Sequence, residues 1–136
     1  MTIATFDDVE AEFEALDDWD DRYRLLIELG RRLPPMDPAL KTEATKVRGC
    51  ASQVWLHTRS DGAQLHFAAD SDAAIVKGLV ALVLMLADGR APRTIDPQAI
   101  RDRLAALGLS KHLSSNRTQG LASIVARIGE LAREAA

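Results

Sequence analysis

Apolar residues recur every third or fourth position in several stretches of the chain, a spacing that places them on one face of a helix. Residues 6–16 show this pattern first, at Phe6, Val9, Phe13 and Leu16. A second stripe begins near Asp18–Asp20, whose carboxylates can cap the free amide groups of a helix start. This helix is predicted to end at the proline-rich segment after its stripe, because proline cannot continue a helix; the stripe is Tyr23, Leu26, Ile27 and Leu33.

The pattern changes between residues 45 and 70, where β-favouring residues stand in short runs. Two of these runs, residues 52–59 and 64–70, flank the turn sequence Ser60-Asp61-Gly62-Ala63 and predict a hairpin. Val47-Arg48 is interpreted as the end of a preceding strand. We therefore expect a small antiparallel sheet of about three strands.

Three more helices are expected after the hairpin. The first runs from Asp72 to Ala87, with Asp70 or Ser71 as its cap and Asp88-Gly89 as its end; its apolar residues cover nearly every face, which is typical of a buried central helix. Asp96-Pro97 starts the second, and Gly108 ends it. Ser114 or Ser115 caps the last, whose stripe is Leu121, Ile124, Val125, Ile128 and Leu131. Five or six helices around a small sheet make an α+β fold.

The composition narrows the class of protein. A length of 136 residues suits one domain, and a net charge of −3 disfavours a dedicated nucleic-acid binder. The longest apolar run, Leu79 to Ala87, is too short to span a membrane. One cysteine excludes an internal disulfide and a multi-cysteine zinc site. Because residues 1–10 lack the basic and apolar regions of a secretory signal, we expect a cytoplasmic protein.

Cys50 is the candidate reactive residue. It lies in a predicted loop, Gly49-Cys50-Ala51-Ser52, outside every apolar stripe. Gly49 allows unusual backbone angles beside the thiol, and Arg48 is close enough in sequence to favour the thiolate. A lone cysteine is also often a small buried hydrophobe, and these residues alone leave both interpretations open.

Other chemistry has weaker support. His57 and His66 fall on the predicted strands and His112 in a polar turn, so nothing directs a histidine toward Cys50 as a catalytic pair requires. The histidines have no neighbouring carboxylate pattern that would indicate a metal site. The glycines are scattered singly and form no phosphate-binding loop. No metal and no nucleotide is therefore expected.

Four blocks of the chain, at residues 27–34, 47–55, 70–79 and 112–121, together resemble the motifs of a known family, the SufE/CsdE family of sulfur-acceptor proteins. The family signature Gly-Cys-Gln-Ser-Gln-Val-Trp is similar to the block around the cysteine, which reads Val47-Arg48-Gly49-Cys50-Ala51-Ser52-Gln53-Val54-Trp55. Residues 70–79 resemble its Ser-Asp-Ala-x-Ile-Val-Lys-Gly run, and residues 112–121 its Leu-(Ser/Thr)-Pro-(Ser/Asn)-Arg-x-x-Gly-Leu segment; residues 27–34 also look familial. The blocks stand in family order and span roughly residues 17–131. Two positions depart from the pattern: Ala51 replaces a common Gln, and Ser115 replaces a common Pro.

The resemblance implies a single SufE-like domain over residues 1–136, with a SufE/IscU-like fold. It implies a sulfur carrier and not an enzyme in the strict sense. Cys50 would take persulfide sulfur from a SufS/CsdA-type cysteine desulfurase, stimulate that enzyme, and deliver sulfur to a scaffold complex that assembles iron–sulfur clusters. Pyridoxal phosphate would belong to the desulfurase, so this chain would bind no cofactor. No nucleic-acid or membrane partner is expected, and the chain would be a monomer or weak homodimer.

The resemblance also suggests supporting residues. Arg117 matches a family arginine and is expected near Cys50, where it would stabilise negative sulfur. Asp72 matches a position beside the cysteine loop and would hold that loop or contact the partner; equally, it is an ordinary first-turn acid favoured by the helix dipole. Ser52 and Gln53 would hydrogen-bond the loop backbone. An apolar floor under the thiol is expected from Val54, Trp55 and Leu56.

Two alternatives from other functional classes stay open. An IscU-like cluster scaffold is one, although clusters usually need several thiolates and this chain has a single cysteine. A protein-interaction module whose cysteine is incidental is the other.

Overall fold

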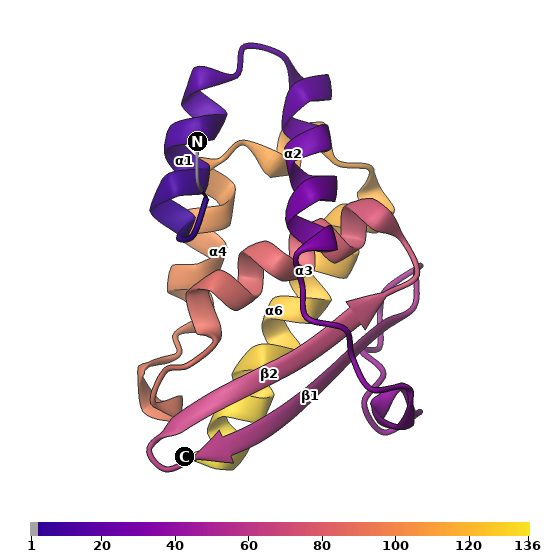
Figure 1. Cartoon of the computed structure of the whole chain (residues 1–136), viewed down its shortest axis with the longest axis vertical. Coiled ribbons are helices and arrows are strands. Elements are labelled where there is room, and N and C mark those ends of the chain that lie inside the picture. The colour runs from indigo at the N-terminus through magenta and orange to yellow at the C-terminus, as the bar shows by residue number, and fades with distance from the viewer. Residues whose placement is uncertain (1–2) are drawn as a thin grey trace.

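The computed structural model describes residues 3–136, which form six α-helices, two short 3-10 turns and one hairpin (Figure 1). This confirms the predicted α+β class. In chain order the elements are α1 (Phe6–Ala15), α2 (Trp19–Arg31), η1 (Pro38–Leu40), β1 (Val54–Asp61), β2 (Gln64–Ser71), α3 (Ala74–Ala87), η2 (Pro92–Thr94), α4 (Pro97–Ala106), α5 (Leu109–His112) and α6 (Ser115–Ala135).

Helix α3 forms the centre of the core, as its all-round apolar pattern predicts. Figure 1 shows it crossing the middle of the molecule, and it packs against α2, α6 and β2. Ten of its fourteen residues are buried, among them Leu79, Val80, Leu82 and Val83. A helix without a polar face is stable in water only when other elements cover it on all sides. The other elements therefore take their places around α3.

The start of α3 differs from the prediction. The helix begins at Ala74, two residues later than expected, and its N-cap Ala73 makes no side-chain capping bond. Asp70 does not cap it because its carboxylate lies between the ammonium groups of Lys41, at 2.6 Å, and Lys77, at 3.2 Å. Ser71 instead accepts a hydrogen bond from the amide of Ala73, just before the helix. Asp88 ends the helix as predicted.

The sheet has two strands, not about three. β1 pairs with β2 in antiparallel register from Val54↔Ser71 to Asp61↔Gln64. The expected third strand is reduced to an isolated bridge between Lys46 and Trp55. Two backbone bonds attach this segment to β1: Val47 N–H donates to the Val54 carbonyl and Leu56 N–H to the Thr45 carbonyl, both at 2.8 Å. The segment then turns away into the cysteine loop, so the ladder of hydrogen bonds cannot extend further.

The later helices begin and end near the predicted residues. The Asp96 carboxylate caps α4, whose first residue is Pro97, and Gly108 follows it with a φ of +81°. Ser114 caps α6 by accepting the Arg117 amide. The segment predicted as a polar turn contains the short helix α5, whose His112 ring stacks on Trp19 at 4.0 Å. No helix in residues 3–136 is long and apolar enough to cross a membrane.

Two glycines let α2 and α3 approach closely. A Cβ built on Gly78 would lie 2.1 Å from the Leu26 carbonyl oxygen, and a Cβ on Gly30 would lie 2.8 Å from the Gly78 nitrogen. Both obstacles are backbone atoms of packed helices, so a side-chain rotation cannot relieve them. The distance between the two helices is therefore set by the absence of side chains at these positions.

Gly78→Ala is predicted to destabilise the protein by about 3 kcal/mol, the upper range for overpacking a core, in spite of alanine's better helix propensity. Urea denaturation followed by circular dichroism measures this change. Gly120→Ala in α6 is the matched control, because a Cβ there makes only an ordinary contact of 3.7 Å with the Cys50 sulfur. The control should be neutral or more stable by up to about 1 kcal/mol. Equal stability of the two variants would contradict the close packing of α2 on α3.

Candidate functional site

The loop that carries Cys50 is closed at its base by the hairpin. Because Val47 donates its amide to Val54, residues 48–53 are held as a loop on the end of β1. Gly49 adopts a φ of +89°, which side-chain-bearing residues rarely reach. The sequence interpretation of Gly49 as the residue that shapes this loop agrees with this geometry.

Cys50 rests on α6. Its Sγ lies 3.5 Å from the carbonyl oxygen of Gly120, to which the thiol can donate. A Cβ on Gly120 would come within 3.7 Å of the sulfur and 3.9 Å of the Cys50 Cβ, so the cysteine lies directly over this glycine. The side chain is half-buried. The thiol is thus placed by residues seventy positions away in the chain.

The thiol faces a cavity of about 360 Å³ between the loop, α3 and α6. Val76 and Leu79 of α3, with Leu121 of α6, form its apolar wall. Polar groups line the rest: Ser52 from the loop and Ser114, Asn116 and Arg117 from the start of α6. Arg117 therefore shares a cavity with Cys50, as its resemblance to the family arginine suggests, and its side chain is exposed.

The apolar surface under the thiol is not formed by the residues predicted for it. Val54 and Leu56 are buried in the main core and Trp55 packs under Lys41, whose ammonium lies 5.4 Å from the ring centroid. None of the three lines the cavity. The reason is that the loop folds back from the hairpin toward α6, so α3 and α6 supply the apolar surface.

Burial raises the pKa of the Cys50 thiol, because the charged thiolate loses solvation in the half-buried position. Arg48 does not counteract this shift. Its guanidinium points toward Glu43, at 3.7 Å, and lines a separate cavity on the other side of the loop. The hypothesis that Arg48 stabilises the thiolate is therefore not supported by this conformation, which stores the sulfur as a neutral thiol.

Asp72 holds the far end of the loop. Its Oδ1 accepts the Gln53 amide at 3.0 Å, and its own amide donates to the Gln53 carbonyl at 3.3 Å. The loop-positioning alternative for Asp72 thus agrees with the geometry. Gln53 takes part through its backbone, while Ser52 and Ala51 line the cavity. Ala51 itself is exposed.

Sequence reasoning missed the residues that receive the loop. Val76 and Leu79 belong to a helix already assigned wholly to the core, and Gly120 carries no hydrophobic signal. The presence of Gly120 in the last family-like block was the one available hint. The histidines lie elsewhere: His112 stacks on Trp19, and His66 lies beside Asp61 and Asp88. Within residues 3–136 no group of three or more His, Cys, Asp or Glu side chains is placed to hold a metal ion.

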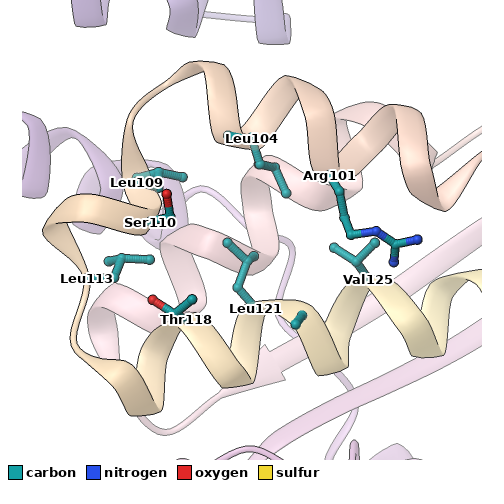
Figure 2. A pocket seen from close by; sticks show the side chains of 10 residues that line it. Arg101, Leu104, Leu109, Ser110, Leu113, Thr118, Leu121 and Val125 are labelled. Atoms are coloured by element: carbon teal, nitrogen blue, oxygen red, sulfur yellow. The ribbon is translucent and has the colours of Figure 1, made fainter.

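A smaller apolar groove adjoins the cysteine cavity. Figure 2 shows Leu104 of α4 facing Leu121 and Val125 of α6 across it, with Arg101 at one end. Its volume is about 210 Å³, and Leu121 lines both this groove and the cysteine cavity. Leu121 therefore forms a partition between them.

Fold and site together define a small α+β domain that shelters one thiol in a loop against its last helix. The family model "SufE: Fe-S metabolism associated domain" matches residues 7–132. The chain thus belongs to the SufE family, which confirms the resemblance seen in the sequence.

Individual relatives agree with this assignment. Uncharacterized SufE-like proteins of Rhizobium meliloti and Rhizobium etli are each 44% identical to the chain, covering 93% and 98% of it and 93% of each relative. The sulfur acceptor protein CsdE of Escherichia coli is 36% identical over 88% of this chain and 82% of its own length. A solution structure of a hypothetical protein from Thermus thermophilus shares the fold, with a TM-score of 0.74, 21% identity, and coverage of 99% of this chain and 98% of that one.

The raised thiol pKa predicts how Cys50 reacts with pH. The Cys50 thiolate, and not the neutral thiol, attacks iodoacetamide and displaces iodide, so the pH midpoint of alkylation in the folded protein should lie above the ordinary value of about 8.5, and above that of the urea-unfolded chain. Between the two midpoints the folded state keeps a proton that the unfolded state has lost. Cys50 should therefore lower the free energy of unfolding as pH rises through this window, and Cys50→Ser should abolish that dependence. Identical midpoints in folded and unfolded chains would contradict a sheltered thiol.

Loss of the Asp72 carboxylate should free the loop. Asp72→Ala removes the acceptor of the Gln53 amide, and we expect the alkylation rate of Cys50 at fixed pH to rise several-fold. Asp72→Asn loses the same charge but keeps a side-chain carbonyl that can accept, so it should stay near the wild-type rate. If both variants were alkylated equally fast and faster than the wild type, the effect would come from the lost charge and not from the hydrogen bond.

Proposed function

We propose that this protein accepts sulfur on Cys50 from a cysteine desulfurase and carries it toward iron–sulfur cluster assembly. The single observation that carries the proposal is the placement of Cys50, the only cysteine of a SufE-family chain, in a closed loop beside an apolar wall. The 36% identity to a protein described as a sulfur acceptor gives further support.

The reaction is a transfer of sulfur between two thiols. The Cys50 thiolate attacks the outer sulfur of a persulfide on the donor enzyme; a new S–S bond forms at Cys50, the donor's S–S bond breaks, and the donor's cysteine leaves as a thiolate. No external oxidant or reductant is needed, because one persulfide replaces another. The donor forms its persulfide from free cysteine with its own pyridoxal phosphate, and removal of that sulfur frees the donor thiol for another cycle. This release is how the chain would stimulate the desulfurase.

The resting geometry suits storage better than attack. In the cavity the thiol is half-buried and its raised pKa keeps it neutral, whereas attack needs a thiolate and access. Docking would draw residues 48–53 away from α6, so that Cys50 ionises in a new environment. Retraction would then return the persulfide to the wall formed by Val76, Leu79 and Leu121, away from reductants in solution.

Arg117 is the side chain best placed to assist. It is exposed at the mouth of the cavity that Cys50 faces, so its guanidinium can approach negative sulfur as the loop moves outward. A guanidinium remains charged at all physiological pH values, which suits it to this task. Downstream, the acceptor would be a scaffold that builds clusters.

Intact-protein mass spectrometry tests the proposal. Incubation with a cognate cysteine desulfurase, pyridoxal phosphate and free cysteine, without reductant, should add one or more sulfur atoms that dithiothreitol removes and that map to Cys50. Cys50→Ser should gain none while keeping its circular dichroism spectrum, because serine is close in size. Absence of sulfur on the wild-type chain, with the desulfurase demonstrably active and Cys50 alkylatable, would overturn the proposal.

A further inference from the structure

Ser123 lies under the cysteine loop on the side away from the thiol cavity. A Cβ built on Gly49 would meet the Ser123 Oγ at 2.5 Å and the Ser123 Cβ at 3.4 Å. Apart from its two chain neighbours, it would approach no other residue of the described range 3–136 within 4 Å. Ser123 is therefore the surface on which Gly49 rests. It also lines the cavity of about 400 Å³ behind the loop, together with Arg48 and Arg127.

Two neighbouring loop residues thus rest on two neighbouring positions of one helix face. Cys50 lies over Gly120 and Gly49 lies over Ser123, and residues three apart on a helix share a face. Both helix positions carry small side chains or none. The tight approach is at Gly49, so the height of the loop above α6 is limited by the size of the residue at 123, whereas the contacts between Gly120 and Cys50 are of ordinary length.

We propose that Ser123 is a positioning residue that sets how deeply the Cys50 loop sits against α6, and so divides the thiol between its sheltered and its presented states. The consequence for sulfur transfer rests on the proposed function; the placement of the loop does not. Ser123 contributes nothing to the buried core, whose α6 members include Ile124, Val125 and Ile128. Its side chain is partly exposed.

The size of the side chain at position 123 affects the thiol through the backbone of the loop. A larger side chain at position 123 pushes the Gly49 peptide away from α6, because the serine side chain already occupies the space that a Cβ on Gly49 would need. Cys50 is the next residue, so it moves off the Gly120 carbonyl and out of the cavity. The thiol then regains solvent, its pKa falls toward the ordinary value, and reagents reach it more easily.

Ser123→Val tests this directly, with Ala126→Val as the matched control. Ala126 lies one turn further on α6 and lines the same rear cavity, yet it does not contact Gly49. Both variants add a β-branched side chain to the same helix. Iodoacetamide alkylation of Cys50 should be several-fold faster in Ser123→Val, with its pH midpoint shifted down, and unchanged in Ala126→Val. Equal behaviour of the two valine variants, or a wild-type rate and midpoint in Ser123→Val, would overturn the inference.

A double-mutant cycle guards against indirect effects. Gly49→Ala should also speed alkylation, since it strains a positive φ and meets the Ser123 oxygen. Ser123→Ala removes that oxygen, so the effect of Gly49→Ala should be smaller in the Ser123→Ala background. Strictly additive effects would show that residues 49 and 123 act independently and would contradict the proposal.

Sulfur transfer supplies a separate readout. With desulfurase-loaded protein, the persulfide of Ser123→Val should be reduced by dithiothreitol faster than that of the wild type or of Ala126→Val. Alkylation needs no sulfur donor, so the two hypotheses fail separately. If Ser123→Val is alkylated faster but the protein accepts no sulfur, the proposed function is overturned and the role of Ser123 stands. If the protein accepts sulfur but Ser123→Val is alkylated at the wild-type rate, the role of Ser123 is overturned and the proposed function stands.

Discussion

The close contact between α2 and α3 at Gly30 and Gly78 is the constraint on which the rest of the molecule depends. It fixes α3 by backbone atoms on one side, and the apolar residues on its remaining faces then require cover from α6, β2 and the N-terminal helices. The thiol site inherits this rigidity. Val76 and Leu79 of α3 form one cavity wall, and the segment leading into α3 supplies Asp72, which holds the loop. The cysteine loop thus rests against a closely packed frame that cannot easily shift.

Shelter and reactivity make opposite demands on Cys50. A half-buried thiol beside leucine and valine resists ionisation, which protects it from oxidants and reductants but leaves it a poor nucleophile. Among residues 3–136 no cation offsets this rise in the pKa of the thiol: Arg48 turns toward Glu43, and the Arg117 side chain lines the same cavity but is exposed. A site that stored a thiolate would need a neighbouring positive charge at rest. The present arrangement instead suits a thiol that becomes reactive only after the loop moves.

Sequence patterns predicted most of the fold because the main signals are local. The stripes of α1, α2 and α6, the cap at Asp96 and the turn at Gly62 each depend on residues a few positions apart. The prediction of a third strand was wrong because its residues are β-favouring yet make only two backbone hydrogen bonds to β1 before the chain turns. The prediction of Asp70 as the cap of α3 was wrong because its carboxylate forms ion pairs with two lysines, one of them from a segment well before the hairpin. Family motifs placed Cys50, Asp72 and Arg117 around one site, but they did not say what lies beneath the thiol.

The receiving surface on α6 escaped prediction for a physical reason. Hydrophobic periodicity marks the residues that a helix buries in its core, whereas Ser123 matters because its side chain is small enough to leave room for the loop. A residue that leaves room for a loop produces no apolar signal, and its partner lies far away in the chain. The same property makes such positions suitable for adjusting the loop: a change of one or two methyl groups alters loop height without touching Ile124, Val125 or Ile128. In this fold the depth at which the thiol sits can therefore vary while the core that supports it stays constant.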